Sequence, residues 1–170
     1  IDHLSKIASD FSQFANIGNP RNEVFDLHDL LYSLTSLYET REHLQFDWDP
    51  VTQRVMLFSD RTQLNRLFTN LFQNAVEAPD GDFPRLIHIG EELNGEYITV
   101  TVKDNGGGIP EHMQDKIFTP NFTTKSSGTG LGLAMSKSIA EQAHGDIWFE
   151  SVLGEGTTFF VKLPLLRATN

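Results

Sequence analysis

Two asparagines four residues apart, Asn70 and Asn74, stand in the apolar-periodic stretch LFTNLFQNAVEA. The apolar residues around them recur at helical spacing, so we predict an amphipathic helix with both asparagines on one polar stripe. Asparagine is a poor mid-helix residue, costing about 0.5 kcal/mol relative to alanine. Its amide oxygen suits Mg²⁺, which proteins usually hold through few side chains together with water and phosphate oxygens. The pair therefore indicates a metal site, and the alternative is an ordinary solvated helix face.

A carboxylate, Asp104, ends the strand pattern YITVTVKD and opens the segment DNGGGIP. Glycines lack side chains, so their backbone can approach a flat ligand closely. Asp104 could accept a hydrogen bond from an exocyclic amine such as that of adenine, with Ile109 packed on the ring. Pro110 suits the first turn of a short helix that reaches Phe118. The alternative is an Asn-Gly turn beside an exposed aspartate.

The stretch NFTTKSSGTGLGL at 121–133 leads from a polar loop into a predicted helix. The first N–H groups of a helix are unpaired and its dipole is positive there, so this junction can bind an anion. Lys125 adds a positive charge, and the neighbouring threonines and serines add hydroxyl groups. The segment 118–129 is long and aperiodic, which favours a functional lid over a flexible loop. It matches neither a Walker loop nor the dinucleotide-binding fingerprint.

The elements that must position these residues follow from hydrophobic periodicity. Strands are predicted at 45–48 and 54–58, and as two hairpins, 85–93 with 96–103 and 146–151 with 157–163. The second hairpin contains the tight turn GEGTTF, which by itself indicates only a hairpin. Helices are predicted at 26–39, from a capping box at Asp60 to about 77, at 110–118 and at 131–143. This order predicts an α+β fold: a two-layer sandwich whose mixed, mainly antiparallel sheet carries three helices on one face, with the lid between a strand and the third helix and the other face in solvent.

The first residues differ from the rest. Residues 1–17 carry apolar side chains at helical spacing, like the seam of a coiled coil, and a Gly-Asn-Pro cluster ends the pattern. We expect 1–17 to be the end of a truncated dimerisation helix, 18–25 a linker, 26–165 the main domain and 166–170 a tail. The chain starts at Ile1 without an initiator Met, so we expect a fragment of a longer protein. No run of about 20 apolar residues occurs, so we expect no direct membrane contact by this fragment.

Composition restricts the partners. The 170 residues carry a formal net charge of -10 and no cysteine. A nucleic-acid surface needs clustered Lys and Arg, so the charge argues against nucleic acid and against an anionic membrane. An anionic ligand would need a metal ion to offset the repulsion. The lack of cysteine excludes disulfides and thiolate metal sites and fits a reducing compartment.

As a set, in this order and spacing, these motifs resemble the catalytic ATP-binding domain of sensor histidine kinases, part of a wider family with gyrase-type and chaperone-type ATPases. NLFQNAVEA resembles the asparagine box, IFTPNFTTK the phenylalanine box, and DNGGGIP, GTGLGL and GEGTTF the three glycine boxes. The likeness covers about residues 20–165. The Glu-Ala pair after the asparagine box and the NFTTK lid look closest to nitrogen-regulation type kinases.

The resemblance implies Mg-ATP bound over the solvent-side face of the sheet, beneath a hinged ATP lid. It implies that Asn74 holds the metal ion, that Asp104 accepts the adenine amine and that Lys125 meets the phosphates. The expected catalytic residues are Asn70, Asn74 and Lys125. The expected nucleotide-binding residues are Asn74, Asp104, Gly106, Gly108, Ile109, Phe118, Thr124, Lys125, Gly128, Thr129, Gly130, Leu131, Gly132 and Thr158.

The related hydrolases carry a glutamate general base where this chain has Asn70, so we expect poor water activation and ATP kept for another acceptor. The implied function is transfer of the γ-phosphoryl group to a histidine on an upstream dimerisation domain, then relay to the receiver domain of a response regulator. This fragment alone is not expected to autophosphorylate. The full protein is expected to be a homodimer, with this domain in the cytoplasm and an inner-membrane anchor elsewhere in the chain as an open alternative. Two other functions stay open: a nucleotide-gated binding module without transfer, and a gyrase-like ATPase.

In the family, the acceptor histidine is followed by an acidic residue and, five positions after the histidine, by proline. His28 has the acidic neighbour Asp29 but Ser33 in place of the proline, and it lies in the first predicted helix of the main domain. We therefore interpret His28 as a surface histidine. Glu77 stands where many relatives carry a basic residue, so we expect it to point away from phosphate or to act through metal or water.

Overall fold

Alternating apolar residues build the centre of the main sheet. The computed structural model describes residues 2–120 and 131–167. In β4 (Arg85–Asn94), β5 (Tyr97–Asp104) and β7 (Gly156–Pro164) alternate side chains are buried, as a sheet covered on one face requires. β5 pairs antiparallel with β4 and β7, β6 (Asp146–Val152) pairs antiparallel with β7, and β2 (Leu44–Asp49) joins β4 in parallel. The order β2-β4-β5-β7-β6 is the predicted mixed, mainly antiparallel sheet.

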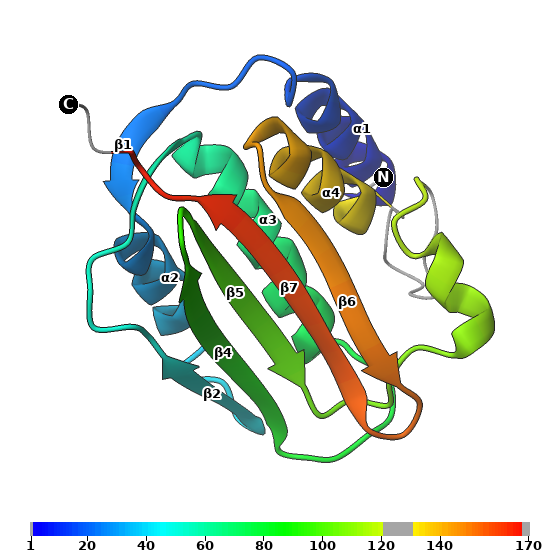
Figure 1. The fold of residues 1–170 in the computed structure, drawn as a ribbon. Helices are drawn as coiled ribbons and strands as arrows, with labels where there is room; N and C mark the ends of the chain where they lie inside the picture. The colour runs from blue at the N-terminus through cyan, green and yellow to red at the C-terminus, as the bar shows by residue number, and fades with distance from the viewer. Residues whose placement is uncertain (1, 121–130, 168–170) are drawn as a thin grey trace.

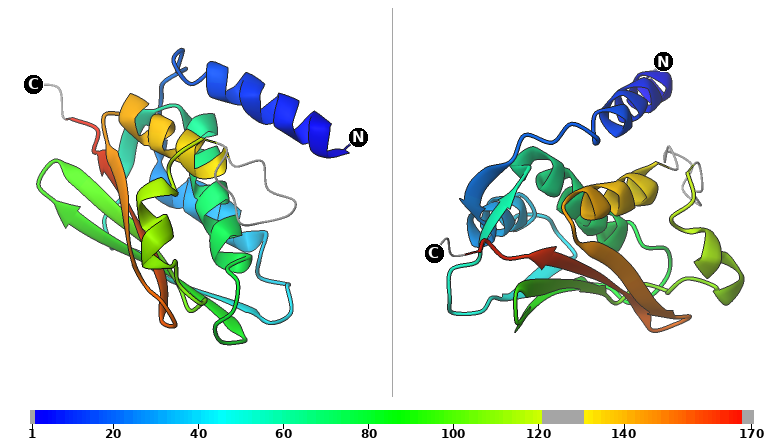
Figure 2. Two further views of the ribbon diagram at one scale, coloured as in Figure 1. Left: turned by 90° about the vertical axis from the view of Figure 1, so that its right-hand side faces the viewer. Right: turned by 45° about the horizontal axis from the view of Figure 1, so that its top comes forward.

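Three helices cover one face of this sheet (Figure 1): α2 (Leu27–Ser36), α3 (Arg61–Val76) and α4 (Gly132–Gln142). α3 crosses the middle of the sheet and buries its apolar stripe, from Leu64 to Ala75, against it. Its N-terminus is capped by Asp60, whose Oδ1 accepts the backbone N–H of Gln63 at 3.1 Å. Turned views show helices and sheet as two layers (Figure 2). The predicted two-layer α+β sandwich is confirmed.

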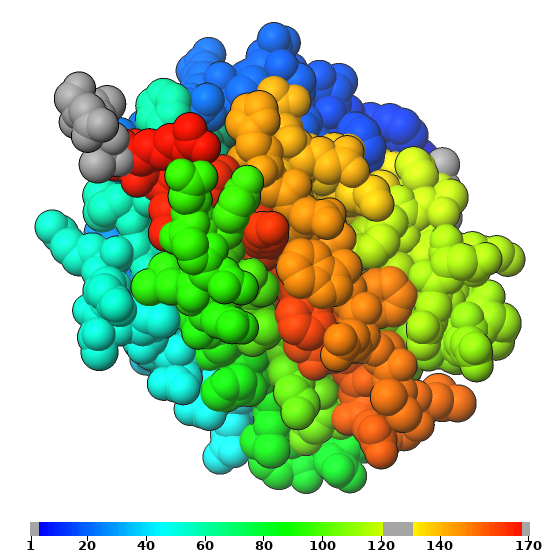
Figure 3. Space-filling model, in the orientation of Figure 1, coloured from blue at the N-terminus to red at the C-terminus, as the bar shows by residue number. Residues whose placement is uncertain are grey.

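The other face of the sheet forms an outer surface. In the space-filling view the side chains of the strands make up most of the front of the molecule (Figure 3). Trp148 of β6 and Phe160 of β7 stack there, with ring centroids 5.3 Å apart and planes at 2°. This face therefore carries a partly exposed aromatic pair rather than a helix layer.

Two predicted boundaries need correction. β1 (Glu23–Asp26) lies mostly inside the segment predicted as a linker, and it pairs antiparallel with β3 (Met56–Ser59) in a separate two-stranded sheet. The predicted strand at 54–58 therefore does not join the main sheet. Leu166, predicted to start a tail, donates its N–H to the carbonyl of Met56 at 2.8 Å. These pairings join residues distant in sequence, so local periodicity could not reveal them.

The helix predicted at 1–17 and the short helix predicted at 110–118 are both present. α1 (Asp2–Ala15) lies beside α3 and α4 (Figure 2), with Leu4 71% and Phe11 54% exposed. η1 (Glu111–Lys116) is a 3₁₀ helix in the place of the short predicted helix. Within the described residues, no helix is long and apolar enough to cross a membrane.

The interpretation of His28 as a surface histidine is wrong. Its side chain is only 20% exposed, and its Nε2 lies 2.6 Å from Oε1 of Glu91. The Glu91 side chain is fully buried and also accepts hydrogen bonds from Trp48 Nε1 at 2.9 Å and from the backbone N–H of Val51 at 3.2 Å. β4 places Glu91 on its core face, so α2 must bring a polar partner to it. His28 therefore has a structural role between α2 and the sheet.

We expect His28→Ala to lower the free energy of unfolding by about 1–3 kcal/mol, because a buried carboxylate loses one partner. Urea denaturation followed by circular dichroism at pH 7 measures this loss. His88→Ala is the matched control: His88 also bonds a carboxylate, Asp47, at 2.8 Å, but the two side chains are 44% and 80% exposed. An exposed pair is worth less than about 1 kcal/mol. Equal losses in the two variants would contradict the structural role of His28.

Candidate functional site

The polar stripe of α3 meets the first turn of α4. Asn70 Nδ2 donates to the carbonyl of Gly132 at 3.1 Å and to Ser136 Oγ at 3.3 Å. Ser136 Oγ in turn bonds the carbonyl of Gly132 at 2.9 Å. Asn74 lies one turn further along α3 and is half-buried. Asn70 thus contacts the helix end that the sequence predicts to face an anion, and Asn74 lies on the same helix one turn away.

Asp104 ends β5 as a buried carboxylate. It is 6% exposed, and its Oδ1 accepts the backbone N–H of Gly106 at 2.8 Å and, more weakly, that of Thr157 at 3.4 Å. Burial raises the pKa of the Asp104 carboxyl above its ordinary value, while these two backbone hydrogen bonds and the charge of Arg85 act in the opposite direction. A buried acceptor at the end of a strand suits recognition of a hydrogen-bond donor on a ligand.

The predicted position of the nucleotide over the solvent-side face of the sheet is corrected by the direction of Asp104. In β5 the buried side chains are Ile98, Val100, Val102 and Asp104, and this is the face that the helices cover. Lys103, between the last two, is exposed on the opposite face. Since side chains alternate along a strand, Asp104 and the asparagines of α3 belong to the space between sheet and helices.

Gly106 packs tightly against the residues around Asp104. A Cβ atom at this position would lie 2.5 Å from Cβ of Ala78, 2.8 Å from Nη1 of Arg85 and 2.9 Å from Oδ1 of Asp104. All three separations are shorter than ordinary van der Waals contact. Only glycine therefore fits where the backbone turns away from the carboxylate.

Gly108 and Ile109 fix the rest of the glycine segment against the turn between β6 and β7. Gly108 has a φ of 77°, a left-handed conformation that favours glycine, and a Cβ atom there would collide with the carbonyl of Val152. The backbone N–H of Ile109 donates to Ser151 Oγ at 2.7 Å. The segment is therefore held rigidly at the edge of the site.

The structure places Thr157, and not the predicted Thr158, on the inner face beside Asp104. Thr158 pairs with Lys103 across the sheet and shares its outer face, so it points away from Asp104. Thr157 is 6% exposed and lies on the inner face, where its N–H reaches Asp104 and its Oγ1 lies 2.8 Å from Ser151 Oγ. The prediction of Thr158 as a binding residue is therefore replaced by Thr157.

Paired variants test this exchange. We expect Thr157→Val to weaken Mg-ADP binding about tenfold, since loss of one buried hydroxyl costs about 1–1.5 kcal/mol. Thr158→Val makes the same chemical change on the opposite face and should leave affinity within twofold, about 0.4 kcal/mol. Isothermal titration calorimetry of both variants decides the matter, and a larger loss for Thr158→Val would restore the original prediction.

Phe118 anchors the chain where the predicted lid begins. Its ring centroid lies 5.9 Å from that of Phe149 and 6.4 Å from that of Phe159, and Lys137 Nζ lies 5.3 Å from it. At the other end Leu131 is buried and Gly132 opens α4. The predicted lid residues Thr124, Lys125, Gly128, Thr129 and Gly130 lie outside the described residues.

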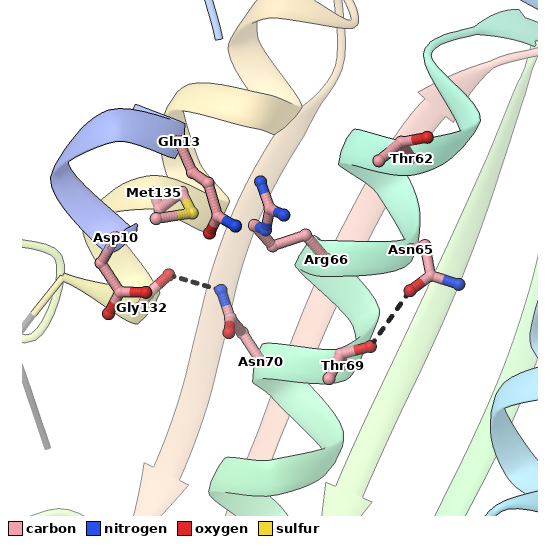
Figure 4. Close-up of a pocket in the computed structure, with 9 residues that line it drawn as sticks. All are labelled: Asp10, Gln13, Thr62, Asn65, Arg66, Thr69, Asn70, Gly132 and Met135. Carbon is pink, nitrogen blue, oxygen red and sulfur yellow. Dashed lines mark hydrogen bonds between the residues drawn. The ribbon is translucent and has the colours of Figure 1, made fainter. Parts of the chain in front are cut away.

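A cleft of about 310 Å³ lies between α1, α3 and α4 (Figure 4). Asn70 and Gly132 form one side of it, and α1 contributes Asp10 and Gln13 to the other. The remaining lining residues are Thr62, Asn65, Arg66, Thr69 and Met135. Asp104 and the glycine segment do not line it, so this cleft adjoins the predicted site and is not the adenine pocket.

Two residues of the site were missed in the sequence. Thr157 was missed because its face depends on the register between β5 and β7. Arg85, which is 2% exposed and borders Gly106, was missed because an arginine at the start of a strand ordinarily indicates a solvent-exposed end. Its alternation with Ile87 and Ile89 was the available signal.

Residues 59–167 match the model of the family described as "Histidine kinase-, DNA gyrase B-, and HSP90-like ATPase". Sporulation kinase B of Bacillus subtilis (strain 168) is 33% identical over 168 residues, which cover 96% of this chain and 39% of the relative. The nucleotide-free catalytic domain of histidine kinase ThkA has a TM-score of 0.76 and 32% identity, covering 85% of this chain and 96% of that one. A complex of histidine kinase ThkA with response regulator protein TrrA has a TM-score of 0.78 and 28% identity, covering 97% of this chain and 49% of that one.

The fold and the five sequence motifs thus define an ATPase-type sandwich. The chain belongs to the histidine kinase, DNA gyrase B and HSP90-like ATPase family, and it is homologous to the catalytic domains of sensor histidine kinases. It spans 39% of the length of the curated relative described above.

Proposed function

We propose that this chain is the ATP-binding catalytic domain of a sensor histidine kinase, which transfers the γ-phosphoryl group of ATP to a histidine on an upstream dimerisation domain of the same protein. The observation that supports this most is the cradle formed by Asp104, Gly106 and Thr157. It places the buried carboxylate of Asp104, as acceptor, beside the backbone of Gly106, where no larger residue fits. A flat heterocycle with an amine at its edge fits such a cradle.

Each predicted residue then takes a defined role. Asp104 accepts the adenine amine, with Ile109 against the ring. Asn74, with Asn70 beside it, holds Mg²⁺, which supplies charge neutralisation at the phosphates when bound. The N-terminus of α4, near Leu131 and Gly132, receives phosphate oxygens. The predicted lid residues, led by Lys125, complete the phosphate site.

The chemistry favours transfer to histidine over hydrolysis. In the transfer, a neutral imidazole nitrogen forms a bond to the γ-phosphorus while the bond to the β–γ bridging oxygen breaks, and ADP leaves. The attacking nitrogen already has a lone pair, so no strong general base is needed. Water, by contrast, must lose a proton. The Asn70 side chain is a carboxamide, which is too weakly basic to accept that proton, and its Nδ2 group is oriented by hydrogen bonds to α4.

The partners extend this proposal beyond the chain. We propose that α1 is the end of the dimerisation helix, that the full protein is a homodimer and that the domain works in the cytoplasm. The ThkA complex contains a response regulator, which supports relay to a receiver domain here. The nitrogen-regulation subtype gains no support from the curated relative, which is named a sporulation kinase. It stays a prediction.

A reconstituted transfer reaction tests the proposal. The chain is mixed with a histidine-bearing dimerisation domain and ATP labelled in the γ-phosphate, and we expect acid-labile phosphohistidine that passes to a receiver domain when one is added. Absence of label under every condition would contradict the kinase function. Nucleotide-dependent amide protection without transfer would support the binding module instead. Appreciable ATP turnover without an acceptor, lost in Asn74→Ala, would support the ATPase.

A further inference from the structure

Arg85 is a buried cation behind the glycine segment. It opens β4 on the inner face, in the same alternation as Ile87, and is 2% exposed. Its Nη2 donates to the carbonyls of Ala78 at 2.7 Å and Asp80 at 2.8 Å, in the loop that leaves the C-terminus of α3. One edge of the guanidinium thus fastens the end of the helix that carries the asparagines.

Nη1 of the guanidinium lies next to Gly106, at the edge of the site. Nε and Nη1 are buried and make no hydrogen bond within the part of the chain that the structure describes. Nη1 and Asp104 Oδ1 flank Gly106, since a Cβ atom there would lie 2.8 Å from the first and 2.9 Å from the second. The ring of Phe83, with its centroid 4.8 Å from the guanidinium carbon, packs against the same group. Buried N–H groups without a hydrogen-bond partner are costly, so the place of Nε and Nη1 near a buried carboxylate indicates a function.

The positive charge of Arg85 favours the ionised form of the Asp104 carboxyl. Burial raises the pKa of the Asp104 carboxyl and so favours the protonated form, while the backbone hydrogen bonds from Gly106 and Thr157 and, to a smaller extent, the charge of Arg85 act in the opposite direction. Only the carboxylate presents acceptors alone. A protonated carboxyl carries a donor, which would face the donor N–H of an amine.

Resting on the proposed function, we propose that Arg85 is a positioning residue of the nucleotide site: it keeps Asp104 an acceptor for the adenine amine and holds the end of α3 beside it. The proposal follows from the placement of one guanidinium between two parts of the site, the α3 terminus and the end of β5. None of the five sequence motifs includes Arg85.

Among the residues that the structure describes, 2–120 and 131–167, no other cation takes the place of Arg85 beside Asp104. Lys103 precedes it in β5, but its side chain is exposed on the opposite face. Thr157 of β7 and Ser151 of β6, on the inner face, are uncharged. The remaining charged side chains at this end, on the C-terminus of α3 and the following loop, are acidic and exposed: Glu77, Asp80 and Asp82. Within the described part of the chain, Arg85 is therefore the residue whose charge acts on Asp104.

The first experiment needs no nucleotide. The Asp104 carboxyl carbon is titrated by ¹³C NMR in the ligand-free chain, for the wild type and for Arg85→Met, which removes the charge and the orphaned N–H groups together. We expect a higher midpoint in Arg85→Met. Arg85→Lys keeps a charge, and Lys103→Met removes the neighbouring exposed one, so both should titrate near the wild type.

The second experiment measures Mg-ADP affinity against pH by calorimetry. Below the midpoint of Asp104, binding must release one proton, so affinity falls by up to about tenfold per pH unit. In Arg85→Met this fall should begin at higher pH than in the wild type, and in Arg85→Lys it should not. A purely structural loss would weaken binding by the same factor at every pH.

The outcomes separate the two proposals. An unchanged Asp104 midpoint in folded Arg85→Met, or a shifted midpoint with an unshifted affinity profile, overturns the role of Arg85. A wild type that binds no Mg-nucleotide overturns the proposed function, whatever the NMR midpoint shows. If Arg85→Met does not fold, Arg85→Lys, which keeps the charge, carries the test: a midpoint and an affinity profile near the wild type support the role, and a midpoint raised in Arg85→Lys overturns it.

Discussion

Asp104→Asn is expected to weaken Mg-ATP binding about 100-fold, or ~2.7 kcal/mol. Oδ1 of Asp104 is engaged by the backbone N–H of Gly106, so the second oxygen is the one left for the ligand. An asparagine that keeps the Gly106 contact turns its NH₂ group towards the adenine amine. Two donors then face each other in a buried site, and sites built for a hydrogen bond lose the most when its partner is mismatched. Calorimetry at pH 7.5 measures the loss.

Two controls sharpen this prediction. Glu150→Gln removes the same charge from an exposed position on the outer face of β6 and should leave the affinity unchanged. A purine riboside triphosphate, which lacks the amine, should bind the wild type more weakly than ATP, and Asp104→Asn should narrow that difference. If Asp104→Asn binds ATP as the wild type does, while thermal denaturation shows it folded, the adenine amine is recognised elsewhere.

Asn74→Ala is expected to reduce phosphoryl transfer to a dimerisation domain by about 100-fold or more, the range for loss of one group that stabilises transition-state charge. Its physical cause is loss of the amide oxygen proposed to hold Mg²⁺. Binding of ADP without magnesium should change little, but the increase in affinity on adding magnesium should disappear. Transfer assays with labelled ATP and calorimetry at both metal conditions measure the two effects.

Asn65→Ala is the matched control for this variant. Asn65 lies on the same helix, is exposed, and accepts a long hydrogen bond from Thr69 Oγ1, at 3.4 Å. Both substitutions replace asparagine with the best helix former, so neither should destabilise α3 through helix propensity. Retained magnesium stimulation in Asn74→Ala would place the metal on other ligands.

The fold was predictable to the extent that its elements signal themselves locally. The alternation at 98, 100 and 102 and the capping pair of Asp60 and Gln63 depend on residues within one turn or one strand, and both appear as expected. The pairing of β1 with β3 was not predicted. These strands have four residues each, and their paired residues are thirty or more positions apart, so a short sequence window shows no pattern of it.

The candidate site shows the same division at the level of single residues. The sequence by itself determined which groups are proposed to carry the chemistry: two amides on one helix stripe, an acid at a strand end and glycines after it. Only the tertiary structure decided which face of the sheet they share, because alternation along a strand does not reveal which side the helices cover. The register of β5 with β7 then selected Thr157 over Thr158, and the packing of β4 under the glycine segment brought Arg85 to Asp104.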